Sequence, residues 1–102
     1  MCSSDLAMGY YALSHNTTGA PNEAFGSQAL YSNTTGAYNV AVGYQAMYAN
    51  TTGTDNVAVG YRAANTLNGG IENTIVGSIA ANILSTGTQN TAIGKEIGRA
   101  HV

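Results

Sequence analysis

The sequence has very few charged residues: 3 Lys and Arg and 5 Asp and Glu among 102 residues, or 8%. An ordinary soluble domain has about 25%. The net charge of -2 provides no basic surface, so we expect no binding of nucleic acid through its phosphates. The apolar runs are short, so we expect no membrane contact. With so few acids, bases and nucleophiles, we expect no enzyme, no catalytic residue, no cofactor and no metal site.

Cysteine and proline occur once each, and tryptophan is absent. The single Cys2 excludes a disulfide within the chain. Residues 2–6 can be encoded by TGCTCTTCCGATCT plus one base, and residues 96–102 by GAGATCGGAAGAGCACACGTC. The second string contains the reverse complement of the first. We therefore predict that residues 1–6 and 96–102 are translated sequencing adapter, which leaves residues 7–95 as one fragment of repeats.

Glycine, asparagine and alanine recur in that fragment at a fixed period of 17 residues, without insertion or deletion. One glycine series falls at Gly9, Gly26, Gly43, Gly60, Gly77 and Gly94. An asparagine series falls at Asn22, Asn39, Asn56, Asn73 and Asn90. The period is too short for repeats of paired helices, and two glycines in every unit disfavour a helix.

The pattern predicts an all-β protein, a parallel β-solenoid (β-roll) of about six 17-residue coils. In the copy that starts at Asn39, we expect one strand at 39–44 and a second at about 46–49, separated by turns. Stacked coils bring residues of one type into a column with a spacing of roughly 4.8 Å. The glycine series then marks a positive φ or a tight corner. The asparagine series is predicted to form a ladder of side-chain amides.

Two neighbouring columns of the expected strand are both apolar. They are Ala24, Ala41, Ala58, Ile75 and Ala92, and Phe25, Val42, Val59, Val76 and Ile93. Adjacent residues of a strand point to opposite faces, so one column fills the interior of the coil and the other needs a partner. The pattern favours self-association about a common axis, and a wider monomeric solenoid is the alternative.

The phrase Asn39-Val40-Ala41-Val42-Gly43 followed by Ala46, with copies at 56–63 and 90–94, resembles the head repeats of YadA-like trimeric autotransporter adhesins. The longer phrase with Asn-Thr-Thr-Gly is similar to repeats of bacteriophage tail fibres and related surface fibres. The resemblance covers residues 7–94. It implies a homotrimer of left-handed β-rolls packed side by side, which serves surface attachment. The unit is longer than that of the adhesins, with the extra residues around Asn-Thr-Thr-Gly.

The expected function is that of a structural repeat segment of an extracellular fibre or adhesin, for surface attachment or display, without catalysis. The expected location is extracellular, at the bacterial cell surface or in a virion tail fibre, and the host-surface or matrix ligand is unknown. A bacteriophage or prophage tail-fibre shaft is one alternative, and an ice- or glycan-binding solenoid is another. Tyr10, Tyr44 and Tyr61 align at one corner as candidate surface-contact residues, although packing between coils also explains them.

Two further motifs have ordinary explanations. The Asn-Thr-Thr triplets that begin at Asn16, Asn33 and Asn50 match the glycosylation sequon. They recur in phase with the repeat, however, so we interpret them as turns. Asp55 and Glu72 are the only acidic pair in one column. Calcium prefers several oxygen ligands, so we interpret this pair as solvated turn residues.

Overall fold

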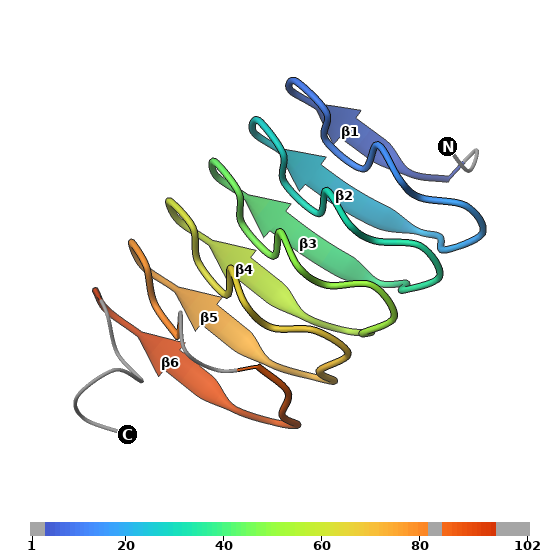
Figure 1. The fold of residues 1–102 in the computed structure, drawn as a ribbon. Helices are drawn as coiled ribbons and strands as arrows, with labels where there is room; N and C mark the ends of the chain where they lie inside the picture. The colour runs from blue at the N-terminus through green and yellow to red at the C-terminus, as the bar shows by residue number, and fades with distance from the viewer. Residues whose placement is uncertain (1–3, 82–84, 96–102) are drawn as a thin grey trace.

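The computed structural model describes residues 4–81 and 85–95, and these form a stack of coils with one short strand in each coil. Figure 1 shows the strands side by side in chain order, all pointing the same way. The strands are β1 (Leu6–Met8), β2 (Asn22–Phe25), β3 (Asn39–Val42), β4 (Val57–Val59), β5 (Thr74–Val76) and β6 (Thr91–Ile93).

The register of the sheet follows the period of the sequence. Ala24 pairs with Ala41, and Ala41 pairs with Ala58, so each strand lies parallel to the next with an offset of 17 residues. Thr54 and Ile71 add an isolated parallel bridge outside the strands. The described residues contain no helix. The predicted all-β parallel solenoid with 17-residue coils is therefore confirmed.

The side chains of each strand alternate between the inside and the outside of the coil. One column points inward and the two columns that flank it point outward. Ala24, Ala41, Ala58 and Ile75 are 0% exposed and point into the coil. Val40 and Val42 flank Ala41 and point outward, where they are half-buried. Small inner side chains let the opposite walls of the coil approach closely, so alanine also fills the facing column at Ala29, Ala46, Ala63 and Ala80.

The glycine that follows each strand is required twice over. Gly43 has a φ of +129°, in a region that L side chains rarely adopt. A Cβ on Gly43 would also lie 2.7 Å from the carbonyl carbon of Gly60 in the next coil. Glycine is therefore the residue that fits this corner, where the chain leaves the strand.

The prediction of a second strand at 46–49 is wrong, because these residues form turns. The first strand, β3 (Asn39–Val42), is shorter than the predicted 39–44. The wall opposite the sheet consists of three consecutive turns, in which Ala46, Tyr48 and Asn50 each donate a backbone hydrogen bond three residues back, at 3.2 Å. Gln45 and Met47 have φ values of 55° and 52°. A positive φ at every second residue prevents an extended chain. The turns still stack, because Met47 N donates to Ala63 O of the next coil at 2.9 Å.

Candidate functional site

The most regular feature of the interior is a column of asparagine side chains at the start of the strands, here called the Asn ladder (Asn22, Asn39, Asn56, Asn73 and Asn90). The first four of these are at most 1% exposed. Asn39 Nδ2 donates to Asn22 Oδ1 at 3.1 Å, and Asn56 Nδ2 donates to Asn39 Oδ1 at 3.0 Å. Asn73 and Asn90 repeat the bond at 2.9 and 3.0 Å. The amides thus form one chain of hydrogen bonds along the axis.

Every polar atom of a central rung in the Asn ladder has a partner. Asn39 Oδ1 also accepts the backbone N–H of Asn56 at 3.1 Å. Asn56 Nδ2 donates its second hydrogen to the carbonyl of Gly70 at 2.7 Å. Such satisfaction matters because an unpartnered buried amide destabilises a fold. One coil before Asn22, Asp5 Oδ1 accepts the Asn22 N–H at 2.8 Å, so a carboxylate takes the first place in the ladder.

A second ladder runs through the Asn-Thr-Thr-Gly corners, which the sequence analysis interpreted only as turns. Asn33 Nδ2 donates to Asn16 Oδ1 at 2.8 Å, and Asn50 Nδ2 donates to Asn33 Oδ1 at 3.2 Å. Asn33 and Asn50 are 0% exposed. Glycosylation of the folded chain at these amides is therefore excluded, because the acceptor nitrogen is buried and engaged. Leu67 is an apolar residue in the same column, and it is the feature of the sequence that indicates a buried column.

The second ladder ends one coil after Asn50, where the segment from Leu67 to Gly70 replaces Asn-Thr-Thr-Gly. Leu67 is 0% exposed and continues the column as an apolar residue. The last amide oxygen of the ladder, Asn50 Oδ1, accepts the backbone N–H of Gly69 at 3.2 Å instead. The buried amide therefore has a partner at the point where polar packing changes to apolar packing.

The outer sheet face consists of the outward side chains of β2 to β5, and its centre is apolar. Val40, Val42, Val57 and Val59 are its half-buried centre. Glu23 and Thr74 are the exposed polar members at its two ends. This is the face for which the sequence analysis expected a partner.

Four of the seven tyrosines form two stacks, of which one is exposed and the other is half-buried. Tyr44 and Tyr61, two of the three candidate surface-contact residues, have parallel rings with centroids 5.5 Å apart. Tyr31 and Tyr48 stack at 5.0 Å. Tyr10, the third candidate, instead packs against Tyr11 at 4.0 Å, and their side-chain hydrogen bond raises the pKa of Tyr10 above 10.0. Within each stacked pair, one face of each ring is covered by the other ring, so packing between coils accounts for these four tyrosines.

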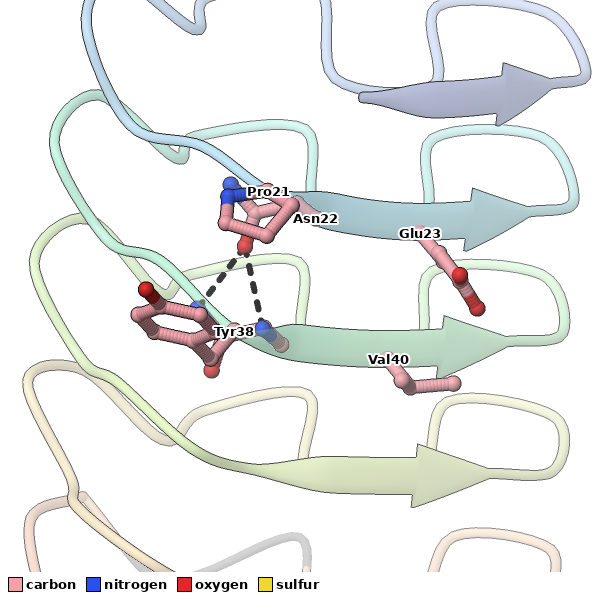
Figure 2. Close-up of a pocket in the computed structure, with 6 residues that line it drawn as sticks. Pro21, Asn22, Glu23, Tyr38 and Val40 are labelled. Carbon is pink, nitrogen blue, oxygen red and sulfur yellow. Dashed lines mark hydrogen bonds between the residues drawn. The ribbon is translucent and has the colours of Figure 1, made fainter. Parts of the chain in front are cut away.

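A shallow groove of about 250 Å³ lies at the start of β2 and β3. Figure 2 shows Tyr38 beside the start of β3, with Glu23 and Val40 further along the strands. Tyr38 is 63% exposed, and its backbone N–H donates to the carbonyl of Pro21 at 2.6 Å. The column that contains Tyr38 continues with Asp55 and Glu72, so the groove does not recur with the same chemistry in the next coils.

The described residues bring together no group of three His, Cys, Asp or Glu side chains that would hold a metal ion. Glu72 Oε1 accepts a hydrogen bond from Gln89 Nε2 at 3.2 Å. His15 Nδ1 lies 3.1 Å from the carbonyl of Tyr31, and its ring contacts the Tyr31 ring edge-on. In the same part of the chain, no helix is long and apolar enough to cross a membrane.

The threonines of the corners are used mainly within the solenoid. The backbone N–H groups of Thr34, Thr35 and Gly36 all point at the carbonyl of Thr51, with distances of 2.9 to 3.2 Å. Thr34 Oγ1 donates to the same oxygen at 3.2 Å. Both threonines of the first pair, Thr17 and Thr18, are exposed, whereas the next two pairs expose only their second threonine. This leaves no paired rows of hydroxyls of the kind that would order water for ice binding.

No family model, curated protein or solved structure matches the chain. The geometry alone must therefore indicate a role. Its principal features are two hydrogen-bonded amide columns inside, stacked tyrosines at the corners and an apolar sheet face outside. The amide columns and the sheet face run along the axis through several coils, and each tyrosine stack joins two coils.

Proposed function

We propose that the chain is a structural repeat segment of an extracellular fibre or adhesin, used for surface attachment or display without catalysis. The observation that carries the proposal is the unbroken 17-residue register. Each coil bonds to the next through its strand, its turns and its Asn ladder, as Val57 N to Asn73 O (2.8 Å) and Met47 N to Ala63 O (2.9 Å) illustrate. Such a body resists bending and grows in length by adding copies.

We further propose that three chains pack side by side through the outer sheet face. A parallel sheet is normally covered on both faces, and the inner face is already filled by Ala41 and Ala58. The half-buried Val40, Val42, Val57 and Val59 would gain burial, and an apolar side chain gains roughly 1.5–3 kcal/mol on full burial. The stoichiometry of three follows from the resemblance to adhesin heads.

Light scattering of the purified chain, coupled to size exclusion, tests this assembly. We expect the mass of three chains for the wild type. The double variant V42K/V59K should be monomeric with an unchanged circular dichroism spectrum, because it places two charges in the proposed interface. The matched control T35K/T52K adds the same charge to exposed corner positions and should remain trimeric. A monomeric wild type, or a trimeric V42K/V59K, contradicts the proposal.

A bacteriophage or prophage tail-fibre shaft needs the same rod, and the Asn-Thr-Thr-Gly corners favour it as the second candidate through their resemblance to fibre repeats. The sequence of the full-length gene would distinguish an adhesin from a tail fibre. A C-terminal membrane anchor would identify an adhesin, and a chaperone domain or neighbouring baseplate genes would identify a tail fibre. A full-length gene in which these repeats lead into a free-standing catalytic domain would contradict both proposed functions.

A further inference from the structure

Asn68 differs from every other asparagine of the chain in the residue that follows it. The sequence contains 11 asparagines, of which ten precede Thr, Val, Ile or Glu, and Asn68 alone precedes glycine. A glycine lets the following backbone nitrogen approach the asparagine side chain without steric hindrance, whereas a β-branched residue hinders that approach. Asn68 is also exposed, whereas Asn56 and Asn73 are buried in the Asn ladder.

The side-chain carbonyl of Asn68 stands where other coils place a backbone carbonyl. Thr34 N and Oγ1 donate to the main-chain oxygen of Thr51, at 2.9 and 3.2 Å. One coil further, Thr51 N and Oγ1 donate to Asn68 Oδ1 instead, at 3.1 and 2.7 Å. Two donors on one amide oxygen polarise its carbon, and they stabilise the negative charge that this oxygen acquires when a nucleophile adds.

The nucleophile is the adjacent backbone nitrogen. Gly69 has a φ of +83° and no side chain. A Cβ at this position would meet only Thr52 Oγ1, at 3.6 Å, so the segment is not closely packed. Gly69 N–H donates to Asn50 Oδ1 at 3.2 Å at the junction where the second ladder ends. This bond has to open before the nitrogen can lose its proton.

We propose that Asn68 is a site of spontaneous covalent modification, in which its side chain cyclises with Gly69 N and is hydrolysed to aspartate and isoaspartate. Solvent hydroxide takes the Gly69 N–H proton, and the nitrogen lone pair forms a bond to Asn68 Cγ. The resulting oxyanion lies on the Thr51 donors. When it collapses, the Cγ–Nδ2 bond breaks and Nδ2 leaves as ammonia after taking a proton from water. A water molecule then opens the succinimide at either carbonyl, and the proton released converts ammonia to ammonium, so the net change is amide plus water to carboxylate plus ammonium.

The two products have different effects on the solenoid. Aspartate keeps two acceptor oxygens for Thr51 N and Oγ1, so the coil persists with one more negative charge. Isoaspartate inserts a methylene into the main chain between residues 68 and 69, which moves Gly69 N away from Asn50 Oδ1. The buried oxygen of Asn50 then loses its hydrogen-bond donor, Gly69 N–H. The packing between the coil that contains Asn50 and the coil that contains Asn68 loosens.

Incubation of the full chain at mildly alkaline pH, followed by peptide mapping and mass spectrometry, tests the proposal. We expect modification to concentrate at Asn68 and to spare the Asn ladder. The T51V variant removes one donor and should slow the reaction about fivefold, which is the effect of a hydrogen bond of about 1 kcal/mol. The matched control T34V removes the equivalent hydroxyl one coil earlier, where it contacts a backbone carbonyl, and should leave the rate at Asn68 unchanged.

Circular dichroism of both variants verifies that they remain folded to the same extent. Modification spread evenly over the asparagines overturns the proposal. So does an intact Asn68 after an incubation that converts a free peptide of residues 65–72. Equal rates in T51V and T34V overturn the assigned role of Thr51.

Discussion

At the scale of the residue, the recurring element is an asparagine that both donates and accepts along the axis. Asn56 shows the complete arrangement, with its amide nitrogen on Asn39 and Gly70 and its oxygen on the backbone and side chain of Asn73. An amide suits this position because it carries donor and acceptor on one planar group. A carboxylate suits only the first rung, where Asp5 has only to accept.

The variant N56L should lower the melting temperature by more than about 10 °C, because about 1 kcal/mol corresponds to 4–8 °C in a domain of this size. It removes the acceptor of the Asn73 backbone N–H and of one Asn73 Nδ2 hydrogen, and one of the two donors on the Gly70 carbonyl. A buried group left without a partner costs about 1–3 kcal/mol. Thermal circular dichroism provides the measurement. The variant N90L, in the same column but exposed, should cost much less. Equal losses would contradict the argument that burial sets the cost.

At the scale of the element, each coil has one strand wall and one wall of turns. The strand lies where small and β-branched side chains alternate across the sheet, as in Val40-Ala41-Val42. The turn wall needs a positive φ at several residues that are not glycine, including Gln45, Met47 and Ile79. These conformations cost roughly 1–2 kcal/mol each, and bonds between coils offset them, as Ile79 N to Tyr61 O at 2.7 Å does.

Ile79 is the least suitable of these residues, because a β-branched side chain at a φ of 60° is strained. We expect I79N to raise the melting temperature by a few degrees, since asparagine tolerates this conformation and relief of about 1 kcal/mol corresponds to 4–8 °C. The neighbouring S78N changes a residue with an ordinary φ and should bring no gain. A fall in stability for I79N would mean that the half-buried apolar contact outweighs the strain.

At the scale of the whole molecule, stability comes from contacts between neighbouring coils. Each strand pairs only with the strands directly before and after it, so the chain resembles a one-dimensional array of repeats in which each interface adds a similar term. The inner columns continue through every described coil as long as the period is kept. The outer sheet face extends in the same way, and this is why the proposed trimer would strengthen with the number of coils.

Duplication of residues 39–55 in place should therefore raise the melting temperature, because it adds one coil and one interface with every column in register. The same duplication with Thr52 omitted should lower the melting temperature below that of the wild type. A 16-residue coil moves Asn, Gly and Ala out of their columns. Thermal unfolding followed by circular dichroism compares the three chains. Equal stability of the 16- and 17-residue insertions would show that the register does not hold the coils together.

Particular residues show how far the sequence predicts the candidate site. The shared period puts Asn39 and Asn56 in one column, and the alternation of a strand puts Ala41 and Val42 on opposite faces. The same reasoning failed at Asn33 and Asn50, because an Asn-Thr-Thr-Gly phrase is equally consistent with an exposed turn. Only the position of the corner relative to the interior distinguishes a buried amide from a solvated one, and that position depends on how tightly the coil closes.

By itself, the sequence determined the period, the parallel register and the residues that share a column, because stacking requires equivalent positions to recur at a fixed spacing. The tertiary structure decided which wall is a strand. Gln45 and Met47 adopt positive φ values that local propensity disfavours, because hydrogen bonds to the adjacent coils, such as Met47 N to Ala63 O, compensate for the strain. The tertiary structure also brought Asn68 Oδ1 within hydrogen-bond distance of Thr51 Oγ1, next to Leu67, the buried residue at which the second ladder ends.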